Sequence, residues 1–393
     1  MQVTEESVVD AVDHNWRKNP QIVDLFSGAG GLSLGAARAG FVVRGAVEND
    51  PIAFGTHKCN FPNTNHISTS VSDLTGKKLL DLIGLKSGSL TGVIGGPPCQ
   101  GFSSIGRKDK NDPRNRLFPE FFRIVAETHP KFFLAENVPG ILYKENSDII
   151  NEGLSFVEDK YVFLPPLVVK ANEYGVATTR TRIFFFGYHQ DKMEPLTTND
   201  FMPSSDIEKI FVKDALRGLP IKINPEWQKE EQSWQIVRTS GSGYYASRLQ
   251  GHVPPGVGEP VALSRLRDES LVSGFLGTRH SDEVVKRYTK VEFGKRDPIS
   301  RATRLDPDGF CPTLRAGTGR DHGSHQALRP IHPTENRVIT PREAARLQGF
   351  PDWFRFAPTK WHSFRQIGSS VSPIIAERLL TVVRNAVGEK SEG

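Results

Sequence analysis

The sequence predicts an α/β fold over roughly the first half of the chain, with a mostly parallel sheet and helices on both faces. Residues 21–26 (QIVDLF) read as a strand that a glycine turn connects to a helix ending at Gly40. Residues 41–47 and 131–135 are two further apolar runs of strand length. Strands that alternate with helix-length segments are typical of a parallel sheet.

The glycine turn, residues 27–31 (SGAGG), precedes a second strand that ends at Glu48. Glycines let the backbone approach a cofactor closely, and an acidic residue at the tip of the second strand can accept hydrogen bonds from ribose hydroxyls. The alternative is that the strand–helix junction needs these glycines for its backbone dihedral angles and binds no ligand. The pairing with Glu48 favours a nucleoside cofactor. The spacing is not G-x-G-x-x-G and no pyrophosphate lysine is present, which favours S-adenosylmethionine over NAD.

Residues 95–101 (GGPPCQG) follow the apolar run 92–94. Two consecutive prolines cannot continue a β-ladder or a helix, so the strand is expected to stop in a stiff turn. This turn would present Cys99 at the carboxyl edge of the sheet, where open α/β sheets bind ligands. Cys99 is therefore a candidate nucleophile, and a small buried apolar residue is the alternative.

Glu136 ends the apolar run that starts at Lys131, and Pro139-Gly140 breaks the chain shortly afterwards. It is expected at the same sheet edge as Cys99. A carboxyl group in a half-dry cleft can act as an acid. The alternative is a solvated glutamate at a strand end.

The sequence resembles the DNA cytosine-5 methyltransferases of bacterial restriction-modification systems. The resemblance rests on seven segments that occur in the family's order. They are residues 24–31, 96–100, 136–138, 174–176, 180–182, 340–351 and 368–371.

This resemblance implies catalytic roles for six residues. Cys99 would add to C6 of a cytosine extruded from the duplex, so that C5 attacks the methyl group. Glu136 would contact N3 of the base, while Asn137 and Pro98 shape the turn that aims the thiol. Arg180 and Arg182 match a pair that holds the cytosine O2 and the catalytic region. They alternate on a predicted strand over 179–186, which places both on one face. Phosphate-binding or surface arginines are the alternative.

The resemblance also implies that the cofactor is S-adenosylmethionine. Glu48 matches the ribose ligand, and Asp73, after a third predicted strand, matches the acceptor for the adenine amine. The full set of matching positions is Phe26, Gly28, Gly31, Glu48, Asp73, Gly96, Pro98, Leu117, Ser369 and Val371.

Three positions depart from the family pattern. Asn49 stands where many relatives have tryptophan, Thr178 where they have glutamine, and Ser369 where they have asparagine. None of these changes removes a reacting atom, so we expect an active enzyme.

The predicted organisation is a catalytic methyltransferase domain (1–194), a smaller target-recognition domain (195–339), a hinge (340–365) and a C-terminal segment (366–393) that returns to the catalytic domain. Residues 201–340 hold 21 lysines and arginines against 17 aspartates and glutamates, most of the net charge of +5. Double-stranded DNA is the expected partner, bound between the domains. The polar, basic stretch 101–116 after Cys99 is expected to act as a lid over DNA.

Cysteine usage and hydropathy indicate a reducing compartment, the cytoplasm, and the resemblance implies association with the bacterial nucleoid through DNA. Only three cysteines are present, at 59, 99 and 311, which argues against a disulfide framework. No signal peptide, membrane span or metal-ligand spacing is recognised. A monomer is expected, possibly encoded beside a separately acting restriction endonuclease.

Three other functions are weighed against this one. A tRNA cytosine-5 methyltransferase shares the chemistry, but relatives of that type have a shorter recognition insert. A catalytically weak DNA-binding relative is disfavoured because Cys99, Glu136 and both arginines are present. A nicotinamide oxidoreductase fits the glycine turn least well.

Overall fold

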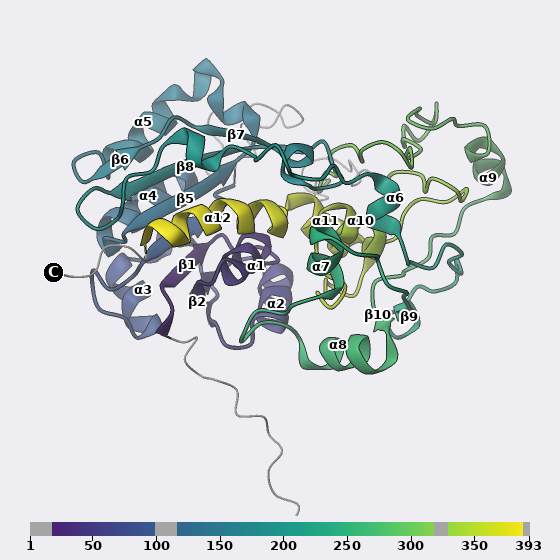
Figure 1. Ribbon diagram of the computed structural model, residues 1–393, viewed down its shortest axis with the longest axis horizontal. Helices are drawn as coiled ribbons and strands as arrows, with labels where there is room; N and C mark the ends of the chain where they lie inside the picture. Colours follow the sequence, from purple (N-terminus) through teal and green to yellow (C-terminus); the bar gives the residue numbers. More distant parts are fainter. Residues whose placement is uncertain (1–17, 99–115, 318–328, 388–393) are drawn as a thin grey trace, which may run out of the picture.

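The computed structural model describes residues 18–98, 116–317 and 329–387. Figure 1 shows a sheet-containing half, made mainly from the first 190 residues and the final helix, beside a half with little regular structure. Within the described residues, no helix is long and apolar enough to cross a membrane.

The central sheet is mixed, with strand order β3-β2-β1-β4-β5-β8-β6 and β7 paired to β8. The five strands from β3 to β5 run parallel, whereas β8 pairs antiparallel with β5, β6 and β7. The strands are β1 (Gln21–Leu25), β2 (Val42–Val47), β3 (Asn65–Ile67), β4 (Gly92–Gly95), β5 (Phe132–Asn137), β6 (Tyr161–Phe163), β7 (Leu167–Lys170) and β8 (Thr181–His189). The predicted α/β class is confirmed, and the parallel part carries the carboxyl edge that the sequence singled out.

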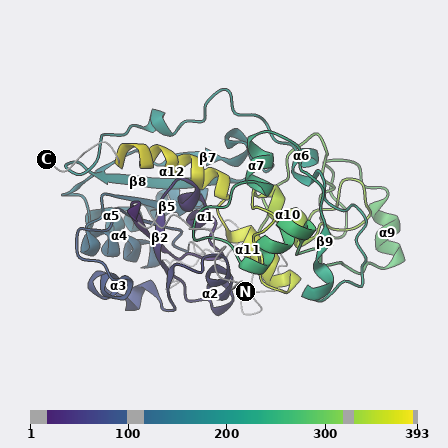
Figure 2. The same ribbon diagram turned by 60° about the horizontal axis from the view of Figure 1, so that its bottom comes forward.

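Helices cover both faces of the sheet. On one face, α1 (Gly31–Arg38) packs against α12 (Pro373–Val387), and Gly35 allows the approach because a Cβ there would lie 2.2 Å from that of Ala376. The other face carries α3 (Gly76–Ile83), α4 (Leu117–Thr128) and α5 (Ser147–Ser155) (Figures 1 and 2). Helix α2 (Pro51–Asn60) follows β2 and is capped by Asp50, whose carboxylate accepts from two backbone amides. The last helix of the chain therefore shares a core with its first strands.

Residues 195–339 are mostly irregular, as their weak periodicity predicts. They contain α6 (Val212–Leu216), α7 (Tyr244–Gln250), α8 (Pro260–Ser264), α9 (Asp282–Tyr288) and a small sheet of β9 (Gln235–Ile236) and β10 (Leu271–Val272). Figure 1 places α9 at the end of the molecule away from α3 and α5. However, the largest apolar cluster includes Ile22, Tyr245 and Ile374 together, so the core does not divide at residue 195. The domain boundaries stay a prediction.

Residues 340–369 supply α10 (Pro341–Leu347) and α11 (Lys360–Ser369). Every residue of α10 is buried, including its charged ones. Arg346 and Asp352 form an ion pair of 2.6 Å with both side chains fully buried, and Arg342 donates to three backbone carbonyl oxygens, those of Ser273, Pro351 and Phe354. Hinge action by this segment stays a prediction; what the structure describes is a densely bonded polar core.

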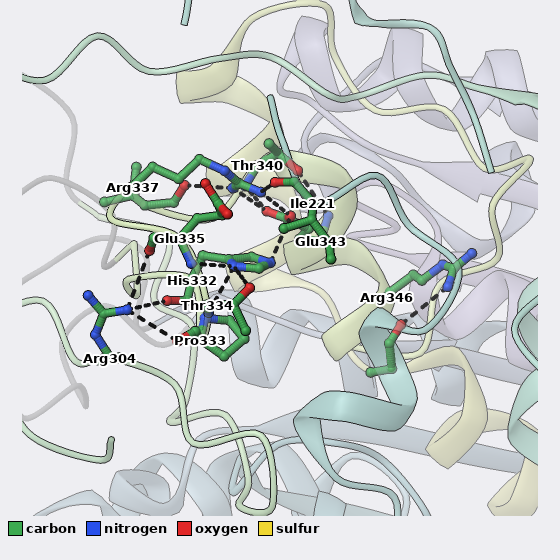
Figure 3. A network of polar contacts seen from close by, with 12 residues as sticks. Ile221, Arg304, His332, Pro333, Thr334, Glu335, Arg337, Thr340, Glu343 and Arg346 are labelled. Carbon is green, nitrogen blue, oxygen red and sulfur yellow. Dashed lines mark hydrogen bonds and ion pairs between the residues drawn. The ribbon is translucent and has the colours of Figure 1, made fainter. Parts of the chain in front are cut away.

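A second cluster joins the start of α10 to the irregular half (Figure 3). Glu343 accepts from the backbone amide of Thr340 and from Arg337, which also donates to the carbonyl oxygen of Ile221. Burial lowers the pKa of His332, 3.5 Å from Glu343, to about 4, so this histidine is neutral at pH 7. Burial acts to raise the pKa of Glu343, but the hydrogen bonds and charge of Arg337 and the amide of Thr340 hold it below its usual value, so the carboxylate stays ionised.

Candidate active site

The glycine turn connects β1 to α1 at the carboxyl edge of the sheet. Its backbone needs left-handed dihedral angles at Phe26 (φ 59°), Gly28 (φ 55°) and Gly30 (φ 103°). A Cβ added to Gly28 would meet only one heavy atom within 4 Å, at 4.0 Å, whereas at Gly30 it would lie 2.4 Å from the Phe61 ring. The turn thus packs on Phe61 at one end and keeps open space beside Gly28 for a ligand.

Glu48 binds this turn directly. One of its oxygens accepts from the amide of Gly28 at 2.8 Å, and the other accepts from the amides of Asn49 and Asp50. Burial raises the pKa of Glu48, while these three N–H groups counteract the rise. A carboxylate has about four acceptor positions, so one remains for a ribose hydroxyl. The open space at Gly28 and the free acceptor position fit a nucleoside cofactor.

Gly31 and Val371 meet on the buried side of the turn. A Cβ on Gly31 would lie 2.2 Å from the carbonyl oxygen of Val371, so only glycine fits between α1 and the C-terminal segment. Ser369 is exposed, and its hydroxyl donates to the carbonyl oxygen of Arg365. Of these two predicted cofactor residues, Val371 meets the glycine turn through its backbone carbonyl, and the Ser369 hydroxyl binds within α11.

The turn after β4 lies against Glu136 and Asn137 at the end of β5. Asn137 is buried and donates from Nδ2 to the carbonyl oxygen of Pro97 at 3.3 Å. A Cβ on Gly96 would lie 3.1 Å from Glu136 Oε2. Cys99, two residues after Pro97, lies outside the described residues, as does most of the predicted lid. The segment that leads into the cysteine is nevertheless fixed beside the predicted acid.

Arg182 pairs with Glu136. Its Nε lies 2.7 Å from Glu136 Oε1, and the two side chains are 13% and 11% exposed. Strand β8 lies beside β5, and Glu136 pairs with Phe184 across it, so the arginine comes from the neighbouring strand. The contact brings the two charges together at the sheet edge without hydrogen-bond geometry, since Glu136 Oε1 has no hydrogen-bond partner among the described residues.

Arg180 has different partners. It donates from Nη1 to the carbonyl oxygens of Leu314 (3.2 Å) and Gly368 (2.7 Å), and from Nη2 to that of Ser369 (3.2 Å). It is buried, and β8 begins at Thr181 rather than at Thr179 as predicted. The two arginines thus bind separate segments: one tethers the irregular half and the C-terminal segment, and the other holds the carboxylate.

The remaining predicted residues lie around this edge. Pro98 and Leu117 lie before and after residues 99–115, which are outside the described residues, and both are half-buried. Phe26 is also half-buried and packs on the core. Asp73 is exposed, in a short 3-10 helix (Val71–Asp73) that follows β3 after three residues. Asn49 is exposed beside Glu48, and Thr178 is buried with no hydrogen-bond partner for its hydroxyl among the described residues.

Sequence reasoning missed four polar residues behind the glycine turn. They are Asp24, Ser33, His57 and His66, which are hydrogen-bonded in series. The only signal in the sequence was a carboxylate inside an apolar strand, because a buried charge needs a partner. Among the described residues, no group of three or more potential ligands is arranged to hold a metal ion.

Comparison with solved structures places the fold among the α/β methyltransferases. A crystal structure assigned as a prophage-encoded DNA modification methyltransferase (E. coli) superposes with a TM-score of 0.84 at 47% identity, covering 94% of this chain and 100% of that one. The S. pombe Dnmt2 methyltransferase superposes with a TM-score of 0.62 at 17% identity, over 94% and 99% of the two chains, which shows a shared fold.

The family model of the C-5 cytosine-specific DNA methylases matches residues 20–385. The chain therefore belongs to this family and is a sequence-specific DNA cytosine-5 methyltransferase. The type II methyltransferase M.XorII of Xanthomonas oryzae pv. oryzae is 39% identical over 376 residues, 94% of this chain and 86% of that protein. The type II methyltransferase M.AgeI of Thalassovita gelatinovora is 29% identical over 426 residues, 93% and 99% of the two chains. Both the family and these relatives agree with the resemblance seen in the sequence motifs.

Proposed function

We propose that the protein methylates cytosine in double-stranded DNA by transient covalent attack of Cys99, with S-adenosylmethionine as the methyl donor. The proposal rests on the position of Glu136. Its carboxylate pairs with Arg182 and lies beside Gly96, in the turn that leads to Cys99, and Asn137 hydrogen-bonds to the same turn.

Cys99 is the proposed nucleophile. Its thiolate adds to C6 of the target cytosine, and the added electron pair makes C5 nucleophilic. After methylation, the proton on C5 leaves and the thiolate is eliminated, which restores the aromatic ring and the free enzyme. Two prolines and the Asn137–Pro97 hydrogen bond restrict the turn that delivers this thiol, which reduces the entropy lost on reaching the reactive geometry.

Glu136 is proposed to approach N3 of the base as a protonated acid and to donate that proton as negative charge develops on the ring. Arg182 contacts Oε1, which leaves Oε2, on the side of Gly96, for the base. A positioned proton donor of this kind offsets the charge that thiolate addition puts on the ring, and the proton returns to Glu136 when the thiolate is eliminated. Arg180 acts as a positioning residue, because its nitrogens bind the carbonyl oxygens of Leu314, Gly368 and Ser369.

The cofactor residues are proposed to bind the nucleoside half of S-adenosylmethionine, which supplies an electrophilic methyl group when bound. Glu48 would accept from the ribose, the open face of Gly28 would lie against the cofactor, and Asp73 would accept from the adenine amine. The other matching positions, among them Phe26, Gly96, Leu117 and Val371, border the same edge of the sheet or the buried side of the turn.

The DNA duplex is proposed to lie between the sheet-containing half and residues 195–339. A base inside a duplex exposes neither face of C6, so the cytosine must leave the stack. The excess of basic residues in 201–340 would neutralise phosphates. We further propose that the protein acts as a monomer in the bacterial cytoplasm and nucleoid, with a restriction endonuclease of the same specificity as its biological counterpart.

Methyl transfer to three substrates tests the proposal. Purified protein and radiolabelled S-adenosylmethionine are incubated with duplex DNA of mixed sequence, with the same DNA as single strands, and with unmodified tRNA. The proposal predicts label in the duplex, at one cytosine of a short recurring site in bisulfite sequencing. Label in tRNA alone would favour the RNA-directed alternative, and label in none would favour a binding protein.

A further inference from the structure

Four polar side chains form a continuous chain from behind the glycine turn to the far edge of the parallel sheet. Asp24 lies on β1, Ser33 on α1, His57 on α2 and His66 on β3. The Ser33 hydroxyl lies 2.6 Å from Asp24 Oδ2 and 3.0 Å from His57 Nε2. The His57 Nδ1 lies 2.9 Å from His66 Nε2. The conversion of cytosine to methylcytosine, as derived above, uses none of these groups.

Asp24 and Ser33 close the base of the glycine turn. Asp24 comes two residues before Phe26, and Ser33 comes two residues after Gly31, so their hydrogen bond joins the strand to the helix behind the turn. Both side chains are completely buried. The second oxygen of Asp24 has no hydrogen-bond partner among the described residues. A buried carboxyl group whose donors come from one residue, the hydroxyl and the backbone amide of Ser33, gains more from being ionised when a positive group approaches.

The four side chains from Asp24 to His66 can make their hydrogen bonds in either of two opposite directions. When Asp24 is ionised, the Ser33 hydroxyl donates to it, His57 donates from Nε2 to Ser33, and His66 donates from Nε2 to His57. When Asp24 is protonated, every bond reverses and His57 donates from Nδ1 to His66. The change from the second state to the first releases one proton to solvent and leaves the proton count of Ser33 and both histidines unchanged.

The groups around Asp24 place the pH at which it ionises near neutral. Burial raises the pKa of Asp24 to about 7. The hydroxyl and the backbone amide of Ser33 oppose this rise, and the nearby Glu48 carboxylate adds to it. Burial and the neighbouring His66 lower the pKa of His57, which is therefore neutral. Burial lowers the pKa of His66 too; a hydrogen bond to the backbone of Thr64 opposes this, and the charge of Lys58 on α2 adds to it. The Phe61 ring stacks on His57 at 4.3 Å, and Phe54 packs edge-on against His66.

We propose that Asp24 is the titrating counter-charge of the glycine turn, and that the chain from Ser33 to His66 stabilises its ionised form when a cationic cofactor occupies the turn. The inference rests on the proposed cofactor. A sulfonium is positive, whereas the thioether left after methyl transfer is neutral. A buried carboxylate behind the turn therefore favours the methyl donor over the demethylated product, and does so only when Asp24 is ionised.

Isothermal titration calorimetry of the full-length protein with S-adenosylmethionine and with S-adenosylhomocysteine tests this inference. The ratio of the two affinities is measured from about pH 5.5 to about pH 8.5, on either side of the pKa of Asp24. We expect the ratio to rise in favour of the sulfonium as the pH increases, by about tenfold for each unit by which the cation lowers the pKa of Asp24. Titrations at pH 7 in two buffers of different ionisation enthalpy should show that binding of S-adenosylmethionine releases more protons than binding of S-adenosylhomocysteine.

Three variants identify the residues responsible. Asp24→Asn keeps the shape and should make the ratio independent of pH. Ser33→Ala and His57→Phe remove donors to the ionised state, so each should move the rise to higher pH. Asp191→Asn, a carboxyl group exposed at the far side of the sheet, is the matched control and should titrate like the wild type. Thermal unfolding of each variant verifies that it is folded.

A ratio that does not vary with pH in the wild type, while both compounds bind, would overturn the inference and leave the proposed function intact. So would an Asp24→Asn protein that keeps the wild-type pH dependence. Failure of both compounds to bind the wild type would overturn the cofactor assignment and this inference together.

Discussion

Arg180 donates to the carbonyl oxygen of Gly368 at 2.7 Å, across a separation of 188 residues. The same guanidinium binds the carbonyl oxygens of Leu314 and Ser369. One side chain at the start of β8 thereby connects the sheet to the irregular half and to the segment that borders the glycine turn. The planar, multiply donating guanidinium is suited to this task, and an ammonium group is not.

Arg180→Lys should therefore destabilise the protein, because lysine keeps the charge but cannot bind three carbonyl oxygens in these directions. We expect a loss of about 2–3 kcal/mol in the free energy of unfolding, from buried hydrogen bonds left unmade. Urea denaturation followed by circular dichroism measures this loss. A variant as stable as the wild type would show that the three hydrogen bonds contribute little.

Arg182→Lys should mainly lower activity, whereas Arg180→Lys should mainly lower stability. The buried Glu136 carboxylate keeps a positive neighbour, so the loss of stability should stay below the loss of about 3–5 kcal/mol expected for a broken buried pair. The carboxylate loses its contact with Arg182 Nε, and we expect kcat to fall by about 10- to 100-fold, as happens when a catalytic group is misplaced slightly. Single-turnover methylation with saturating cofactor measures this step. Unchanged turnover would argue against an orienting role for Arg182.

Gly31→Ala should be strongly destabilising, because the added methyl group would lie 2.2 Å from the carbonyl oxygen of Val371. Overpacking of this kind typically costs about 1–3 kcal/mol. Gly55→Ala is the matched control. Gly55 lies on an exposed part of α2 with no heavy atom within 4 Å of its added Cβ, so alanine there should stabilise the protein by about 0.5–1 kcal/mol. Equal effects in thermal unfolding would contradict this account of the helix contact.

Arg346→Met should cost about 3–5 kcal/mol, because it leaves the fully buried Asp352 carboxylate without its cation. Arg267→Met provides the comparison, since the Arg267–Asp268 pair is exposed and should contribute no more than about 1 kcal/mol. Chemical denaturation of both variants distinguishes the buried pair from the surface pair. A small effect at Arg346 would mean that water or a neighbouring group compensates Asp352.

The sequence predicted the elements that position the site because their signals are local. The strands at 21–25, 42–47 and 92–95 lie within one residue of their predicted bounds. Glycine and proline mark these ends directly, through allowed dihedral angles and the missing N–H group. Strands β4 and β5 run parallel with Gly95 opposite Ala135, so the residues that follow, Glu136 and the Pro97–Pro98 turn, lie together at the carboxyl edge.

Other features depend on contacts between distant segments and could not be predicted. Period-2 spacing suggested equivalent roles for Arg180 and Arg182, yet only tertiary packing brings Gly368 to one and Glu136 to the other. The series behind the glycine turn joins four separate elements, and a lone histidine such as His57 carries no signal of its partners. The predicted hinge, residues 340–365, contains arginines whose partners, buried carbonyl and carboxylate oxygens, could not be inferred from the sequence.

The formation of a covalent bond between Cys99 and cytosine is the central claim, and trapping tests it most directly. In duplex DNA with 5-fluorocytosine at the methylated site, fluorine replaces the C5 proton and cannot leave in its place. The thiolate is then not eliminated, and the enzyme should stay bound covalently to the DNA. We predict a band resistant to denaturation that forms only with S-adenosylmethionine and whose cross-linked peptide contains Cys99. Cys99→Ser should form no such band while it still binds the cofactor. A wild-type enzyme that methylates DNA without forming the adduct, or a Cys99→Ser variant with full activity, would contradict the account.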